Sequence, residues 1–204
     1  DSDHTFIFDE AGFEATDFST PVKVLGLFEP SHMQFELDRD KDKAGEPHIA
    51  EMTRAAITRL SQDPDGYVLM VEGGRIDHGH HAGNAIRALE DAMAFDLAVA
   101  TALEMTNPEE TLIIVTADHS HTLTIAGYAQ RGNPILGLSV SGIGGEGGAN
   151  GADGLPYTTL SYANGPGACF EKGKDAKGEP IYECKRQDLT NVDTLAPDFR
   201  QPAL

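Results

Sequence analysis

The fold is decided by the stretch YVLMVEGGRIDHGHH, which runs from Tyr67 to His81. Its apolar part, residues 67–71, does not alternate with polar residues, so it predicts a short strand buried on both faces, as in a parallel sheet. Glu72 and a glycine pair follow, and then Asp77 and, four residues later, His81. The stretch therefore delivers carboxylates and imidazoles where a buried strand ends.

A second stretch, TLIIVTADHSH (111–121), repeats this arrangement. Its apolar run at 111–115 predicts another buried strand, followed by Asp118, His119 and His121. Between the two strands, an apolar stripe at helical spacing predicts a long helix over 82–105, formed by Ile86, Leu89, Met93, Leu97, Ala100 and Leu103. Strand, helix and strand form a βαβ unit with a right-handed crossover. Ligands collect beyond the carboxyl ends of such strands, where these donors lie.

The sequence patterns that predict the remaining elements are weaker. Residues 22–28 (VKVLGLF) predict a strand, and Pro47 suits the first turn of a helix that continues through Ile49, Met52, Ala56 and Leu60. Residues 1–21 are expected to be irregular, residues 39–47 to form a charged loop, and the glycine-dense residues 137–154 to form a flexible surface loop. The whole chain of 204 residues is long enough for one α/β domain with its own core.

The formal net charge is −18. Such a surface repels nucleic-acid phosphates and anionic lipids, so neither is expected as a partner. It also repels a free phosphate ester unless metal cations reverse the sign locally. No apolar run is long enough to span a bilayer.

Two cysteines, Cys169 and Cys184, lie fifteen positions apart. A disulfide between them would stabilise the fold by ~3 kcal/mol in the entropy model and would imply an oxidising compartment. Two free thiols are the alternative. Metal ligation by this pair alone is not expected, because the spacing is not that of a zinc site.

The donors at the two strand ends suit divalent metals. Asp77 and His81, four apart at a helix start, share one face, and a carboxylate with a neutral imidazole suits zinc. Asp118 and His119 offer the same donors, while Glu72 better suits magnesium. For any one of these residues a helix cap or a solvated side chain is the simpler interpretation. For the set of five a shared cation is favoured, because burying that polarity alone is costly.

Other segments carry further information: GLFEPSHM (26–33), AGEP (44–47), AEMT (50–53), NAIRALEDA (84–92), RGNPILG (131–137) and GLPYTTLSYANGPG (154–167). Together with VEGGRIDHGHH and VTADHSHT, they resemble the alkaline phosphatase family from about Val22 to the end of the chain. The resemblance implies a three-layer sandwich around a mostly parallel central sheet. Residues 1–204 would be only the C-terminal portion of that single domain.

The resemblance also implies roles for the donors. Asp77 and His81 would hold the first zinc, Asp118 and His119 would help to hold the second, and Glu72 would bind magnesium. His121 would orient an aspartate ligand by a hydrogen bond, and His78 would face the bound phosphate through water. His80 is expected at the surface, and Arg75 in a salt bridge with a local carboxylate rather than as a phosphate clamp.

The activity implied is hydrolysis of small phosphate monoesters through a phosphoserine. The family's Asp-Ser-Ala segment, which carries the nucleophilic serine, does not occur here, and no histidine follows His121 to supply the third zinc ligand. No catalytic nucleophile is thus expected in this chain, which would be inactive without the missing N-terminal half of the enzyme. The alternatives are a related two-metal phosphodiesterase, sulfatase or phosphomutase, or an inactive metal-binding module.

Three further expectations come from the resemblance. In animal members of the family, positions matching Phe28, Glu29 and Glu46 bind calcium, although exposed acidic loops are an alternative interpretation here. The complete enzyme would be a homodimer. It would be periplasmic or extracellular, with a signal peptide that is not in this chain.

Overall fold

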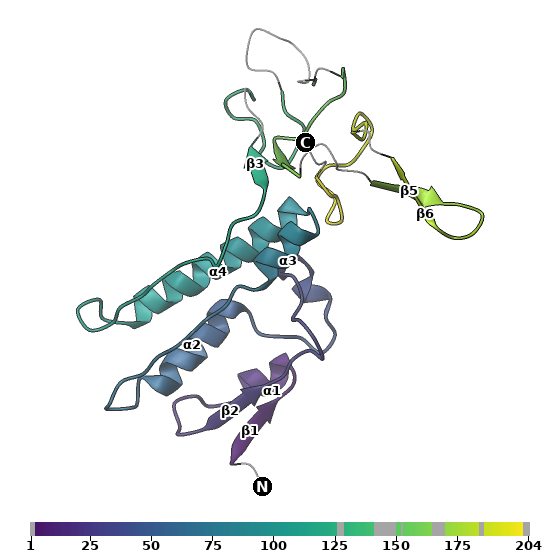
Figure 1. Ribbon diagram of the computed structural model, residues 1–204. Helices are drawn as coiled ribbons and strands as arrows, with labels where there is room; N and C mark the ends of the chain where they lie inside the picture. The colour runs from purple at the N-terminus through teal and green to yellow at the C-terminus, as the bar shows by residue number, and fades with distance from the viewer. Residues whose placement is uncertain are drawn as a thin grey trace. The chain divides into compact units, whose positions relative to one another are not determined.

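The computed structural model describes residues 3–125, 129–140, 150–151, 153–164, 170–183 and 186–201. The chain divides into two compact units, which are described separately below. The first comprises Asp1–His78 and Arg87–His119, and the second comprises Gly79–Ile86 and Ser120–Leu204. Figure 1 shows the course of the chain through both units.

The first unit begins with a small βαβ arrangement. Strand β1 (His4–Ile7) pairs in parallel with β2 (Lys23–Gly26), and helix α1 (Glu10–Glu14) lies between them in sequence. Asp9 caps α1 by accepting a hydrogen bond from the backbone N–H of Gly12 at 2.7 Å. The strand predicted over 22–28 is confirmed in β2, but the irregular course predicted for 1–21 is wrong. Elements of four and five residues are too short for periodicity to reveal, and β1 exists only through its pairing with β2.

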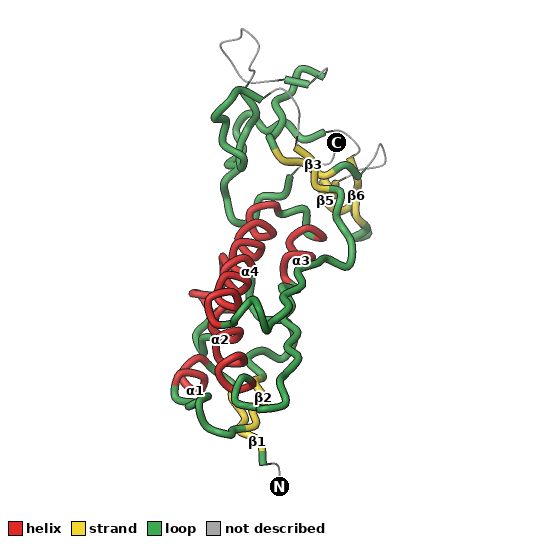
Figure 2. The backbone as a smooth tube through the Cα atoms, turned by 90° about the vertical axis from the view of Figure 1, so that its left-hand side faces the viewer, coloured by secondary structure: helices red, strands yellow, loops and turns green. Residues whose placement is uncertain are grey.

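Two longer helices follow the predictions in their bounds. Helix α2 (Ile49–Leu60) starts just after Pro47, and α4 (Ala85–Met105) lies inside the range predicted for it. The start of α2 is fixed by a capping box, in which Nδ1 of His48 accepts from the N–H of Ala50 while the Glu51 carboxylate accepts from the N–H of His48. Figure 2 shows these helices in red, and the 3-10 helix η1 (Glu36–Lys41) precedes α2.

The buried face of α4 differs from the predicted one. The helix buries a narrow face of small residues, namely Ala85, Ala88, Ala94, Ala98 and Thr101. Within the predicted stripe, Met93, Leu97 and Leu103 are exposed. The large apolar side chains therefore point to a surface that the described residues leave uncovered.

The prediction of buried strands at 67–71 and 111–115 is wrong. Both segments are extended, but neither pairs with another strand. Among the described residues, their only backbone hydrogen bond is a local one, from the N–H of Thr111 to the carbonyl of Asn107 at 2.9 Å. Side-chain exposure alternates along residues 67–71 and 111–114, and the outward apolar residues are largely exposed: Val68 95%, Met70 77%, Leu112 83% and Ile114 75%. This period of two is that of a β-strand. The two segments therefore have the backbone geometry of strands and one partly covered side, but they belong to no sheet.

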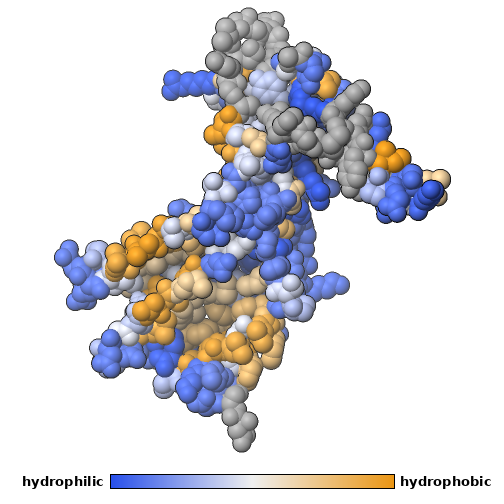
Figure 3. All heavy atoms as spheres, viewed as in Figure 1, coloured by the Kyte–Doolittle hydropathy of each residue, from blue (hydrophilic) through white to orange (hydrophobic). Residues whose placement is uncertain are grey.

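Apolar side chains gather widely on the face of the first unit seen in Figure 3. A groove of about 560 Å³ lies between α1, α2 and the β1–β2 pair, and Ile7, Phe13, Val24, Met52 and Leu60 are among its lining residues. Large exposed apolar areas mark surfaces that another part of a protein covers. The first unit thus presents an α/β layer with its apolar faces open.

The second unit is built from short antiparallel pairs. Strand β3 (Leu123–Ile125) pairs with β4 (Leu160–Tyr162), and β5 (Phe170–Lys174) pairs with β6 (Pro180–Glu183). Helix α3 (Arg75–His81) crosses from the first unit into the second between His78 and Gly79. The mostly parallel sheet predicted for the domain is represented, within the described residues, by β1–β2 alone.

Some predictions fall outside the described residues. These are the disulfide between Cys169 and Cys184, and the flexible loop for residues 141–149 and 152. On either side of that loop, Leu138 bridges Thr158 and Asn150 bridges Pro156. Among the described residues, no helix has the length and apolar character that crossing a membrane requires.

The open apolar face leads to a stability prediction. Leu112→Gln should change the free energy of unfolding by no more than about 0.5 kcal/mol, because the side chain is already in water. Ile57→Ala, at a buried position of α2, should cost about 2–5 kcal/mol. Urea unfolding of both variants checks this, and a loss of more than 1 kcal/mol for Leu112→Gln would mean that residues 111–115 are covered in solution.

Candidate metal centre

Glu72 and Asp77 stand on either side of the turn that starts α3. Glu72 ends the extended segment and is exposed, and Asp77 lies in the first turn of the helix. The two glycines between them make close approaches: a Cβ on Gly73 would meet Ile76 and Phe95, and a Cβ on Gly74 would lie 3.2 Å from Oε1 of Glu72. The glycine pair thus lets the turn pack tightly and leaves room for the Glu72 carboxylate.

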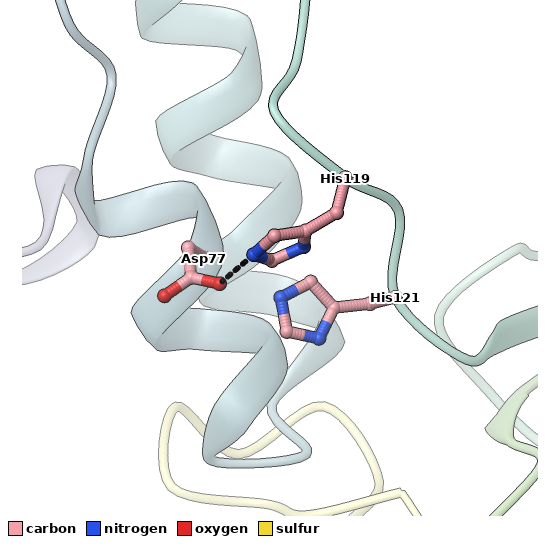
Figure 4. Close-up of side chains that lie close together, drawn as sticks. All are labelled: Asp77, His119 and His121. Carbon is pink, nitrogen blue, oxygen red and sulfur yellow. Dashed lines mark ion pairs between the residues drawn. The ribbon is translucent and has the colours of Figure 1, made fainter.

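The end of the second extended segment comes back to α3. Nε2 of His119 lies 4.0 Å from Oδ1 of Asp77, and a dashed line marks this pair in Figure 4. The same nitrogen lies 3.4 Å from Oδ2 of Asp118. The Asp118 carboxylate also accepts a hydrogen bond from the backbone N–H of His119 at 3.0 Å. Two carboxylates from segments about forty residues apart therefore flank one imidazole. All three side chains are open to solvent, and Asp118 is the most exposed.

The second unit contains a cluster of three imidazoles. The rings of His80 and His121 stack with centroids 4.9 Å apart, and those of His81 and His121 meet edge-on at 5.0 Å. Nδ1 of His80 is 2.9 Å from the hydroxyl of Tyr162, whose pKa burial raises to about 12. His80 is therefore half-buried and held by Tyr162, so its prediction as a surface residue is wrong. The signal was missed because Tyr162 lies far away in sequence.

Arg75 also departs from its prediction. Its guanidinium lies over the ring of Phe35, 3.7 Å from the centroid, and Nη1 is 3.2 Å from Nδ1 of His78. The ring of His32 packs on that of His78, with centroids 4.3 Å apart. Among the described residues, Arg75 forms no salt bridge within 4.0 Å. Burial lowers the pKa of Arg75, and the negative charge of Asp91 raises it in part.

A second acidic cluster lies at the predicted calcium positions. Oxygens of Glu29, Asp42 and Glu46 all lie within 4.8 Å of one another. Glu46 is only 1% exposed, and one of its oxygens accepts a hydrogen bond from the N–H of Gln34. The other oxygen of Glu46 and one of Asp42 are buried without a hydrogen-bond partner. Burial raises the pKa of Glu46, and the neighbouring Glu29 and Asp42 raise it further.

Such a cluster is costly without a cation. Three carboxylates repel one another, and buried oxygens without partners lose their hydration. Oxygen donors of this kind are the ligands that calcium prefers. Phe28, the remaining predicted contributor, immediately precedes Glu29. Asp42 was not predicted, because the charged loop around it hides one carboxylate among several. Asp42 differs from the other carboxylates of the loop in its position, because it is the residue that caps the C-terminal end of η1.

Comparison with known proteins decides the family. The family model for alkaline phosphatase matches residues 4–193. The chain belongs to the alkaline phosphatase family.

Several curated members of the alkaline phosphatase family resemble the chain. It is 48% identical over 144 residues to the tissue-nonspecific isozyme of Gallus gallus and 46% identical over 144 residues to that of Homo sapiens. Each match covers 71% of this chain and 26% of the relative. A match to the isozyme of Rattus norvegicus is 43% identical over 162 residues and covers 79% of the chain and 29% of the relative. The chain thus spans about a quarter of the length of these relatives.

Among solved structures, the chain is similar to the crystal structure of Thermus thermophilus alkaline phosphatase. The sequences are 30% identical, and the match covers 50% of this chain and 20% of that chain with a TM-score of 0.43.

Ionisation of the Asp91 carboxyl group on α4 is expected to lower the stability of this alkaline phosphatase chain. Its Oδ2 accepts a hydrogen bond from the N–H of Glu36 at 3.2 Å, and burial raises its pKa from 3.8 to about 6. A carboxyl whose pKa is raised in the folded state contributes stability that is present below its unfolded pKa. That contribution is lost as the pH rises through the folded pKa.

Asp91→Asn should therefore remove a penalty at neutral pH. We expect the free energy of unfolding of the variant, relative to the unmodified chain, to increase as the pH rises from about 4 to above 6. Urea unfolding at pH 4, 5.5 and 7.5 measures the difference. Asp96→Asn, at an exposed position of the same helix, is the matched control. A difference for Asp91→Asn that stays constant with pH would contradict the assignment.

Proposed function

We propose that this chain carries most of the metal ligands of a phosphomonoesterase, which hydrolyses phosphate monoesters through a phosphoserine intermediate. The observation that carries the proposal is the approach of His119 to Asp77, with Asp118 beside the same ring. Membership of the alkaline phosphatase family and the names of the relatives support the substrate class.

The residues present fit the metals of such an enzyme. Asp77 and His81 would hold one zinc, Asp118 and His119 a second, and Glu72 a magnesium, since zinc prefers imidazole and carboxylate donors and magnesium prefers oxygen. Bound there, the ions supply positive charge that stabilises phosphoryl oxygens and offsets the net charge of −18. The chain offers two ligands to each zinc, so the other positions fall to water, substrate or residues outside this sequence.

Neighbouring histidines complete the proposed site. His78 follows Asp77 directly and would face the phosphate through water, while His121 would orient an aspartate ligand by a hydrogen bond. A histidine or carboxylate next to a metal ligand fixes the ligand's orientation through hydrogen bonds, and its loss typically costs 10–100-fold in metal affinity or activity.

The partner of this chain is the N-terminal half of the same enzyme, which supplies the nucleophilic serine. Two observations support this partner. The segments 67–71 and 111–115 have strand geometry without pairing, and their outward apolar side chains are bare. A strand of another segment can add to such edges through backbone hydrogen bonds, and burying the apolar side chains favours that association. The isolated chain is expected to be inactive.

A chimera tests the function. This chain replaces the matching 144-residue segment in the Gallus gallus isozyme, and hydrolysis of p-nitrophenyl phosphate is measured with zinc and magnesium. The chimera should be active and the isolated chain inactive. Asp77→Asn in the chimera should lower activity by more than ~100-fold, because the loss of a metal ligand exceeds that of a supporting residue.

Asp65→Asn, at an exposed turn, is the matched control and should retain activity. Full activity of the Asp77→Asn chimera would contradict the proposed metal site. Faster turnover of bis(p-nitrophenyl) phosphate than of the monoester would replace the proposed reaction by a phosphodiesterase. A chimera that binds zinc without any turnover would favour the inactive metal-binding module.

We also propose that Glu29, Asp42 and Glu46, with the carbonyl of Phe28, bind calcium. The cluster's unpartnered buried oxygens support the proposal, because a cation would remove both the repulsion and the desolvation cost.

Calcium at 100 times its dissociation constant should stabilise the chain by about 2.7 kcal/mol, seen as a rise in the melting temperature. Glu46→Gln should abolish this response and should stabilise the calcium-free chain, because it removes a charge from the buried cluster. Glu109→Gln, at an exposed position, should leave both unchanged. An undiminished calcium response in Glu46→Gln would exclude the site.

A further inference from the structure

Arg75, the first residue of α3, is held in place before any ligand binds. Its guanidinium carbon lies 3.7 Å from the centroid of Phe35, within the range of a cation–π interaction. Its Nε is buried without a hydrogen-bond partner. The side chain is thus fixed by packing, and its terminal nitrogens are directed by that packing rather than by a salt bridge.

The contact between Arg75 and His78 has a definite chemical direction. Nη1 of Arg75 is 3.2 Å from Nδ1 of His78, and the two residues lie three apart on α3, which places them on the same side of the helix. A guanidinium has N–H donors and no acceptor. Nδ1 must therefore accept the hydrogen bond, so the proton of a neutral His78 ring is carried by Nε2.

His32 restrains the same ring from another direction. Its imidazole packs on His78 with centroids 4.3 Å apart and planes inclined by 59°. A flip of the His78 ring would exchange its nitrogens with carbons and would break the bond to Arg75, although the ring plane would stay in contact with His32. His32 therefore restrains the plane of the ring, and Arg75 fixes its flip state and its tautomer.

We propose that Arg75 and His32 are positioning residues that lock His78 as its Nε2–H tautomer, so that the ring offers a hydrogen-bond donor to the water through which it would face an anionic phosphate. The inference rests on the proposed function in one respect, namely that His78 faces the phosphate. Arg75 thereby acts on the substrate through His78 and does not clamp it directly. A donor fixed in advance loses little entropy when the anion binds.

Nitrogen NMR tests the tautomer directly. The full chain is labelled with ¹⁵N-histidine, and long-range ¹H–¹⁵N spectra are recorded at pH 9, where an ordinary imidazole is neutral. The signals of His78 are identified as those lost in His78→Gln. We expect Nδ1 of His78 to give the signal of an unprotonated nitrogen and Nε2 that of a protonated one.

Three variants separate positioning from general structure. Arg75→Met, which keeps the length and loses the donors, should move the His78 Nδ1 signal towards the protonated value as the second tautomer becomes populated. Arg75→Lys, which keeps a donor, should shift it less. Arg54→Met removes an exposed arginine that pairs with Glu104, and it should leave His78 unchanged.

A protonated Nδ1 in the unmodified chain would overturn the proposal, and so would a His78 spectrum that is the same in Arg75→Met. If Arg75→Met does not fold, the unmodified spectrum and Arg75→Lys still decide. The measurement needs neither metal nor substrate, so its failure is distinguishable from a failure of the proposed phosphatase activity.

Discussion

The approach of His119 to Asp77 is the contact on which the candidate site depends. It joins the end of one extended segment to the helix that follows another, and it brings the Asp118 carboxylate to the same ring. A carboxylate and an imidazole at this distance form at best a weak solvent-exposed ion pair, which is worth ~1 kcal/mol or less. Its chemical value lies in metal binding, because each of the two carboxylates lies within about 4 Å of the imidazole, and carboxylate and imidazole donors are the ligands that zinc prefers.

The same two segments differ strongly in exposure between their two sides. On their inward side, alternate residues are partly covered, whereas the outward residues are almost bare. On α4, alanines are buried while methionine and leucines are exposed. A surface of this kind is stable only when a further layer covers it, and the chain spans about a quarter of its relatives' length. The proposed metal ligands thus lie on an α/β layer whose extended segments have no strand partner among the described residues.

Sequence reasoning succeeded where the cause was local. The bounds of α2 and α4 follow from helical periodicity and from the capping residues near His48, which are readable within a few positions. Prediction from the sequence failed where a structural feature is determined by residues far away in the chain. A strand is defined by its neighbour, so the apolar runs at 67–71 and 111–115 predicted strands that the described residues cannot pair.

The same distinction applies to the site residues. Glu29 and Glu46 were predicted through the family's motifs, whereas Asp42 emerged only when the chain folded around them. Tyr162 and His32 were missed for the same reason, since each contacts its histidine across many tens of residues. Arg75 was expected to pair with a carboxylate, but its guanidinium packs on the ring of Phe35 and donates to an imidazole nitrogen of His78.

Paramagnetic NMR can test whether the ends of the two extended segments bind divalent cations at one common site. Addition of Mn²⁺ to the ¹⁵N-labelled chain broadens amide signals near the bound ion. At substoichiometric Mn²⁺, the amides around Asp77 and those around Asp118 and His119 should lose intensity together and before the other acidic segments, and zinc should restore both. Broadening of only one of the two segments, or equal broadening at all acidic positions, would contradict a common site.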